Sequence, residues 1–252
     1  MFKTNYNYFH KSRAILKNKT ISIIGYGRQA RSQALNLLDS NFNVILGLRD
    51  GYSYQQAIND GWKENYNLFN IEEAADRGDI IKYLLSDLGQ INQWDNIKPY
   101  LKMDKTLYFS HGFGITYSDQ TKIKPPEDID VVMVTPKCKG TNVRLNFLTC
   151  KGINASYAIH QDFTGNAKDT CLALAFSIGC KNVFKTTFQN ETHLNLLREN
   201  SVLMTLIQDT FKSQYYILRE KDYSPNDAYN KIVKDILISL WPLIKDKKWN
   251  NN

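Results

Sequence analysis

The chain has 252 residues, with 32 Lys plus Arg against 25 Asp plus Glu and a formal net charge of +7. Hydrophobic residues make up 42% and charged residues 23%, a soluble globular composition that excludes the disordered and fibrous classes. The length supports one large domain or two small ones. Because no stretch approaches about 18 uncharged apolar residues, the sequence predicts neither a membrane span nor a membrane partner.

The cysteines and the basic residues exclude further classes. The four cysteines are widely spaced and form no CxxC pair, which argues against zinc ribbons, redox motifs and a secreted disulfide scaffold. The basic residues are scattered and not clustered with aromatic residues, so no nucleic-acid partner is expected. We interpret residues 1–20 as a basic arm of the domain, with a mitochondrial targeting segment as the alternative, and predict a cytoplasmic location.

Apolar strands and amphipathic helices alternate along residues 20–187. A buried strand is predicted at 20–25, and a helix at 29–40 carries Ala30, Ala34 and Leu37 on one face. Further strands are predicted at 43–48, 80–85, 106–110, 130–135, 156–160 and 183–187. This alternation predicts an α/β fold with a mostly parallel sheet covered on both faces.

After residue 188 the pattern becomes helical. Apolar residues recur at helical spacing from 191 to 219, and Ser224 with Pro225 forms a typical helix start. We therefore predict two domains, at 1–187 and 188–252, the second all-helical. Such a short helical domain has to bury its apolar face on the first domain or on a partner subunit.

A glycine-rich turn links the first predicted strand to the first helix. Residues 25–30 read Gly-Tyr-Gly-Arg-Gln-Ala, which fits the GxGxxA variant of the dinucleotide-binding fingerprint. Gly25 allows the tight turn, Gly27 lets the backbone approach a pyrophosphate, and Ala30 allows close packing of helix on strand. The helix N-terminus then attracts the phosphates. The first domain is thus predicted to be a Rossmann-type nucleotide-binding domain.

The end of the second strand indicates which dinucleotide is bound. NAD enzymes usually have Asp or Glu there, whereas here the predicted strand is followed by Arg49. Arg49 can hold a 2′-phosphate, with Ser53 as a hydrogen-bond donor nearby. The alternative is a solvated turn in which Arg49 pairs with Asp50. NADPH is the predicted cofactor.

Six motifs, in order along the chain, resemble those of ketol-acid reductoisomerase, also called acetohydroxy-acid isomeroreductase, in its short form. They are IGYGRQA (24–30), LLSDLGQ (84–90), YFSHGFG (108–114), VVMVTPK (131–137), HQDFTGNAK (160–168) and TTF (186–188). The resemblance implies a Rossmann domain followed by a helical, knotted domain through which subunits pair. It also implies the conversion of 2-acetolactate or 2-aceto-2-hydroxybutyrate to the dihydroxy acid, with NADPH and two Mg²⁺ ions, in branched-chain amino-acid synthesis.

The resemblance assigns roles to individual residues. The cofactor-binding set is Gly25, Tyr26, Gly27, Arg28, Gln29, Arg49, Ser53, Asp87, Gln90 and Gly140, and the catalytic pair is His111 and Lys137. From the sequence alone, His111 and Lys137 each follow a predicted strand, where sheets of this class bind ligands. Alternatively, His111 is a hydrogen-bonded structural residue and Lys137 is an ordinary exposed lysine.

The four positions that match the family's metal ligands depart from its carboxylates. They read Asn195, Glu199, Lys231 and Asp235, so their formal charge is −1 where four carboxylates would give −4. Mg²⁺ prefers anionic oxygen ligands, and two such ions would be poorly neutralised here. One ion held by Glu199 and Asp235 is one hypothesis. Replacement of a metal by a pair between Lys231 and Glu199 is the other.

The family continues beyond the last motif with helices that this sequence does not contain, so the helical domain is expected to be incomplete and to expose apolar surface. Three functions remain open. The first is a ketol-acid reductoisomerase, and the second is an impaired NADPH-binding homologue or partner subunit without that activity. The third is a reductase that no longer isomerises.

Overall fold

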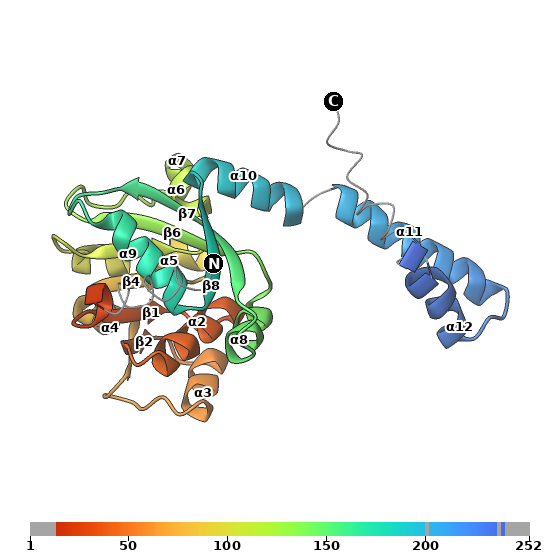
Figure 1. Cartoon of the computed structure of the whole chain (residues 1–252), viewed down its shortest axis with the longest axis horizontal. Helices are drawn as coiled ribbons and strands as arrows, with labels where there is room; N and C mark the ends of the chain where they lie inside the picture. The colour runs from red at the N-terminus through yellow and green to blue at the C-terminus, as the bar shows by residue number, and fades with distance from the viewer. Residues whose placement is uncertain (1–13, 200–201, 236–237, 240–252) are drawn as a thin grey trace. The chain divides into compact units, whose positions relative to one another are not determined.

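The computed structural model describes residues 14–199, 202–235 and 238–239 (Figure 1). The chain divides into two compact units between His193 and Leu194. The predicted domain boundary lies a few residues earlier and stays a prediction.

The first unit is built on one eight-stranded sheet of order β3-β2-β1-β4-β5-β6-β7-β8. Neighbouring strands are parallel except β6 and β7, which are antiparallel. The strands are β1 (Thr20–Ile24), β2 (Asn43–Gly47), β3 (Leu68–Phe69), β4 (Ile80–Tyr83), β5 (Thr106–Phe109), β6 (Asp130–Pro136), β7 (Ile153–Gln161) and β8 (Cys180–Lys185). The predicted α/β class and mostly parallel sheet are confirmed.

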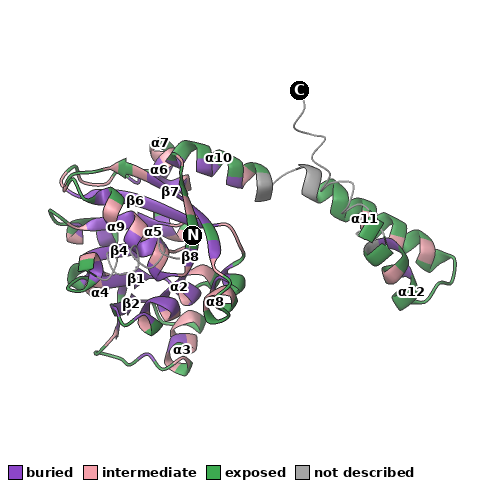
Figure 2. Cartoon of the chain, in the orientation of Figure 1, coloured by how far each residue is buried: buried purple, intermediate pink, exposed green. Residues whose placement is uncertain are grey.

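Helices cover both faces of the sheet, and the strands in the middle are buried (Figure 2). One face packs against α2 (Arg28–Asp39), α3 (Tyr52–Asn59), α8 (Gly140–Leu148) and α9 (Ala167–Ser177). The other packs against α4 (Ile71–Arg77), α5 (Asp87–Ile97) and α6 (Phe113–Thr116). The buried side chains form two hydrophobic clusters, one on each face of the sheet. Ile80 and Ile81 belong to different clusters, because successive strand side chains point to opposite faces. Two buried faces explain why the central strands are mostly apolar, as in β1, β2 and β5.

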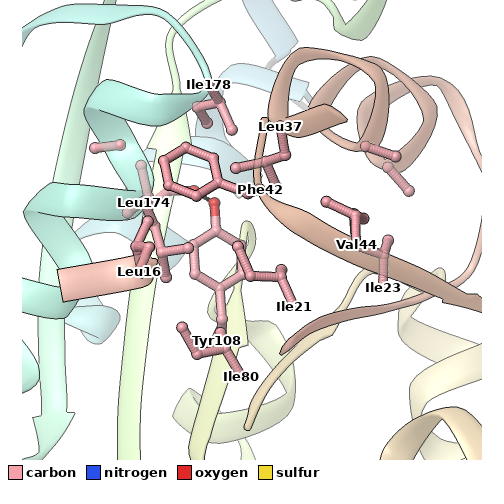
Figure 3. Close-up of a cluster of buried hydrophobic side chains, with 14 of the residues drawn as sticks. Leu16, Ile21, Ile23, Leu37, Phe42, Val44, Ile80, Tyr108, Leu174 and Ile178 are labelled. Atoms are coloured by element: carbon pink, nitrogen blue, oxygen red, sulfur yellow. Dashed lines mark hydrogen bonds between the residues drawn. The ribbon is translucent and has the colours of Figure 1, made fainter. Parts of the chain in front are cut away.

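In the first of these clusters, Tyr108 of β5 lies among aliphatic side chains, as Figure 3 shows. Ile21 comes from β1, Leu37 from α2 and Leu174 from α9. This packing fixes α2, the helix that follows the glycine turn, against the sheet.

Several predicted ends differ from the structure by a few residues. The strand predicted at 80–85 ends at Tyr83, because Leu84 and Leu85 already form the turn to α5. The strand predicted at 183–187 is β8, and the one predicted at 156–160 is the longer β7. The pattern also missed β3, whose two residues are too few to show a periodicity. The first unit further contains η1 (Lys98–Tyr100) and α7 (Ser118–Thr121).

The described part of the second unit is helical. Helix α10 (Phe188–Glu199) crosses the division, and α11 (Val202–Glu220), α12 (Pro225–Tyr229) and the π-helix η2 (Asn230–Lys234) follow. The predicted cap is confirmed, since the Ser224 hydroxyl accepts a hydrogen bond from the Asp227 N–H at 3.1 Å. The incompleteness of this domain stays a prediction. None of the helices described is both long and apolar enough to span a bilayer.

Candidate active site

The turn between β1 and α2 permits close approach of a ligand. Gly25 has φ +101°, and a Cβ there would lie 2.9 Å from the Leu84 carbonyl oxygen, so larger residues are excluded. A Cβ at Gly27 would meet nothing within 4 Å. Gly27 also caps α2 without a side chain of its own. N–H groups at a helix N-terminus of this kind attract phosphate.

A cavity of about 360 Å³ opens beside this turn, at the carboxyl ends of β1, β2 and β4. It is lined by residues 25–27, 47–53 and 84–86 and by Ile71. Strand order reverses at β1, which is where sheets of this class bind their ligands. Arg49 and Ser53, the residues predicted to hold the 2′-phosphate, both line the cavity. Within the described ranges no ion pair joins Arg49 to Asp50.

Two residues predicted to contact the cofactor point their side chains into the protein instead. The Tyr26 ring is 2% exposed, and its hydroxyl donates a hydrogen bond to Asp60 Oδ2 at 2.8 Å. Tyr26 can therefore offer a phosphate its backbone but not its hydroxyl. The Gln90 side chain is also buried, and its amide donates to the carbonyls of Tyr83 and Leu85 at 3.3 and 3.1 Å. Gln90 thus holds the turn after β4.

Gln29 and Gly140 join the glycine turn to the start of α8. The Gln29 amide donates to the Cys138 carbonyl at 3.0 Å. A Cβ at Gly140 would lie 2.5 Å from the Arg28 carbonyl carbon, so only glycine fits against this backbone. The structure therefore gives Gly140 a packing role beside the turn. Contact of Gly140, Gln29 or the exposed Arg28 with a cofactor stays a prediction.

His111 lies just beyond the carboxyl end of β5. Its Nδ1 accepts a hydrogen bond from the Phe113 N–H at 3.3 Å and lies 3.6 Å from Asp87 Oδ1. In the neutral form the ring proton is then on Nε2, which has no hydrogen-bond partner among the described residues. The preceding Ser110 hydroxyl accepts a hydrogen bond from the buried Gln33 amide at 3.0 Å. His111 is thus held by a hydrogen-bonded turn, and its Nε2 is a buried polar atom without a partner among the described residues.

Lys137 follows β6 directly and pairs with a residue that the sequence analysis did not single out. Its Nζ hydrogen-bonds Glu191 Oε1, and the Ser156 hydroxyl donates to Glu191 Oε2 at 2.7 Å. The Glu191 side chain is 1% exposed and the Lys137 side chain 24% exposed. The carboxylate therefore holds a partly accessible ammonium group in a fixed place. The signal for Glu191 was its position three residues after the TTF motif ends at Phe188.

The His111 turn and the Lys137–Glu191 pair both rest on the first half of α10. A Cβ at Gly112 would lie 2.6 Å from the Thr192 hydroxyl, so the turn packs directly on this helix. The Thr116 and Thr192 hydroxyls also hydrogen-bond at 3.0 Å. Since β5 and β6 are parallel neighbours, His111 and Lys137 lie at the same edge of the sheet.

The four positions that the resemblance assigns to metal ligands do not form a fitting donor set. Asn195 offers an amide, Lys231 an ammonium group and Asp235 an exposed carboxylate, while the Glu199 side chain lies outside the described residues. An ammonium group repels a cation instead of ligating it. In the described ranges no group of three or more His, Cys, Asp and Glu residues could hold a metal ion. The residues present therefore do not fit two Mg²⁺ ions.

Comparison with known proteins identifies the family. The model of the acetohydroxy acid isomeroreductase NADPH-binding domain matches residues 15–184, more than half of the chain. The chain belongs to the ketol-acid reductoisomerase family. This confirms the resemblance drawn from the six motifs.

Individual members of the family match over most of the chain. The ketol-acid reductoisomerase (NAD(+)) of Desulfosudis oleivorans is 48% identical over 94% of this chain and 67% of its own length. The mitochondrial ketol-acid reductoisomerase of Saccharomyces cerevisiae is 47% identical over 90% of this chain and 58% of its own length. The solved structure of an NADH-preferring ketol-acid reductoisomerase from an uncultured archaeon has a TM-score of 0.81 at 33% identity, covering 92% of this chain and 71% of that one. The chain thus spans 58% to 67% of the length of these two curated relatives.

Proposed function

We propose that this chain binds NADPH beside the glycine turn and acts as a ketol-acid reductoisomerase in valine and isoleucine biosynthesis. Its substrates would be 2-acetolactate and 2-aceto-2-hydroxybutyrate, which undergo alkyl migration and then reduction to the dihydroxy acid. The observation that carries the proposal is the common placement of the cavity, His111 and Lys137 at the carboxyl edge of one sheet. Family membership supports it.

The residues that line the cavity support NADPH as the cofactor. Bound NADPH would supply a hydride to the substrate's carbonyl carbon. The N–H groups at the start of α2 suit its pyrophosphate, and Arg49 with Ser53 suits its 2′-phosphate. NADH is the competing cofactor, because the Desulfosudis and archaeal relatives are named for NAD(+) and NADH. The Arg49 guanidinium lies on the cavity wall and has no ion-pair partner in the described part of the chain, which favours NADPH.

His111 and Lys137 are the residues that we assign to the substrate. Reduction of a carbonyl adds a hydride to carbon and a proton to oxygen, and the substrates are carboxylate anions. The Lys137 ammonium group can attract the anion and donate a hydrogen bond to an oxygen, while Glu191 holds it in place. His111 Nε2 carries a proton in the neutral ring and can donate in the same way.

A second candidate function is an NADPH-binding homologue or partner subunit without isomeroreductase activity. Lys231, at a position where the family has a metal-binding carboxylate, specifically favours it. A reductase that no longer isomerises also remains open, because the nucleotide half does not depend on that donor set. Mg²⁺ dependence therefore separates the candidates.

We also propose that the chain assembles with copies of itself through its helical residues. Leu206, Tyr216 and Ile217 of α11 are exposed, which supports an apolar contact surface. A cytoplasmic location and the absence of a nucleic-acid partner stay predictions.

The test is NADPH oxidation by the purified chain with 2-acetolactate, with and without Mg²⁺. We expect turnover, and Mg²⁺-dependent turnover supports the complete reaction. NADPH binding without turnover, in protein shown to be folded, contradicts the isomeroreductase and favours the second candidate. Reduction of a simple 2-keto acid alone, without conversion of 2-acetolactate, indicates the reductase.

A further inference from the structure

A cluster of polar side chains lies behind the glycine turn and is centred on Asp60, the residue that caps the end of α3. The Tyr26 hydroxyl donates to Asp60 Oδ2 at 2.8 Å. The Arg31 guanidinium donates to both carboxylate oxygens, at 2.6 and 2.7 Å. The Trp62 indole N–H donates to the Tyr26 hydroxyl at 2.8 Å. One carboxylate thus accepts three hydrogen bonds, one from Tyr26 in the glycine turn and two from Arg31 in α2.

This cluster is charged and partly enclosed, with the Arg31 side chain 42% exposed. The Asp60 side chain is 15% exposed, and the Arg31 pair lowers the pKa of its carboxyl group, so it is ionised at neutral pH. Trp62 packs edge-on against Tyr26, with ring centroids 6.2 Å apart. Bidentate, charge-assisted hydrogen bonds are about twice as strong as neutral ones and fix orientation as well as distance. The cluster therefore holds its members in one arrangement.

The cluster connects two walls of the nucleotide cavity. Tyr26 belongs to the turn that approaches the pyrophosphate, and Arg31 belongs to the first turns of the helix that follows it. Asp60 caps α3, and Ser53 lies at the other end of that helix, on the wall that also carries Arg49. Asp60 thus ties the turn to the helix that carries part of the other wall.

We propose that Asp60 is a positioning residue that sets the separation of these two walls and thereby the preference of the site for a dinucleotide with a 2′-phosphate. The inference rests on the nucleotide site of the proposed function. NADPH contacts both walls and is sensitive to their separation, whereas NADH has no 2′-phosphate for the Arg49 wall. Displacement of a positioned group by about 1 Å is enough to lose most of a well-aligned interaction.

The variants are chosen to separate positioning from folding. Asp60→Asn keeps the shape of the side chain but removes the charge that orients Arg31. Tyr26→Phe removes only the hydroxyl and keeps the buried ring. Asp76→Asn is the matched control, because its exposed carboxylate pairs with Lys102 and does not line the cavity. Dissociation constants of NADPH and NADH are measured by fluorescence titration, alongside thermal unfolding.

We expect Asp60→Asn to raise the dissociation constant of NADPH by about tenfold, equivalent to about 1.4 kcal/mol, and that of NADH by about threefold or less. Tyr26→Phe should raise the ratio of the NADPH to the NADH dissociation constant by a smaller factor than Asp60→Asn does. Asp76→Asn should leave this ratio unchanged. An unchanged ratio in Asp60→Asn and Tyr26→Phe, with wild type binding NADPH, overturns this inference alone. A folded wild-type chain that binds neither dinucleotide overturns the nucleotide site and this inference with it.

Discussion

Replacement of Lys82 by methionine should stabilise the protein by several kcal/mol at pH 6.5. Lys82 lies in β4 with its side chain fully buried, and its Nζ has no hydrogen-bond partner among the described residues. The ammonium group is 3.9 Å from the centre of the Tyr108 ring, which compensates only part of the cost of leaving water. Methionine has a similar length and no charge, so it should fill the same space without that cost.

The pH dependence of this effect has a definite sign. Burial lowers the pKa of Lys82 from 10.5 to about 7, which corresponds to roughly 5 kcal/mol at about 1.4 kcal/mol per pKa unit. Between these two values the unfolded chain binds the proton and the folded chain does not. The contribution of Lys82 to the free energy of unfolding therefore rises with pH in that window. The penalty is full below pH 7 and is relieved towards pH 10.5.

Denaturant unfolding of wild type and Lys82→Met at pH 6.5 and 9.5 measures this. The free energies of unfolding of wild type and Lys82→Met should differ by several kcal/mol at pH 6.5, and this difference should be smaller at pH 9.5. Lys102→Met, at a lysine whose side chain is 63% exposed, is the control and should change stability by less than about 1 kcal/mol. A Lys82→Met variant that is less stable than wild type, or a gap that does not change with pH, contradicts the burial argument.

Replacement of Lys137 by methionine should lower the free energy of unfolding by several kcal/mol. It removes the Lys137 ammonium group from the Glu191 carboxylate, whose side chain is only 1% exposed. Removal of one partner of a buried ion pair typically costs on the order of 3 to 5 kcal/mol, because the remaining charge stays desolvated. The Ser156 hydroxyl still donates to Glu191, but a neutral hydroxyl does not balance the charge.

The pair is tested by a double-mutant cycle. Glu191→Gln combined with Lys137→Met should recover part of the lost stability, since it removes the uncompensated charge. The exposed pair of Lys102 with Asp76 is the control, and its loss should cost less than about 1 kcal/mol. A Lys137→Met variant within about 1 kcal/mol of wild type would show that Glu191 does not depend on this cation.

The parts of the site that follow from local pattern could be predicted from the sequence. Gly25 and Gly27 lie in a strand–turn–helix, so their role follows from spacing alone. Arg49 follows the next strand and Ser53 lies in the first turn of α3, and both line the same cavity. The alternation of strands and helices also predicted most of the sheet, since parallel strands buried on both faces give continuous apolar runs.

The residues that the sequence did not indicate depend on contacts between distant segments. Glu191 is 54 residues from Lys137, and its closeness to the TTF motif does not show that it is buried and paired with that lysine. Lys82 lies in an otherwise apolar strand, and from the sequence alone such a lysine is expected to face solvent. Only the structure shows that α9 and its neighbours cover that face of the sheet. Tyr26 is one of three variable positions of the glycine motif, and only the fold shows its hydroxyl on Asp60. The antiparallel β7 likewise depends on the path of the chain through α8 and not on strand propensity.

The cavity beside the glycine turn should bind NADPH whether or not the metal positions hold Mg²⁺. The most direct measurement is a fluorescence titration of the purified wild-type chain with NADPH, repeated with Mg²⁺ added. We expect one NADPH bound per chain, with the same dissociation constant in both titrations. A folded chain that binds no NADPH at millimolar concentration, or that binds it only when Mg²⁺ is present, would contradict it.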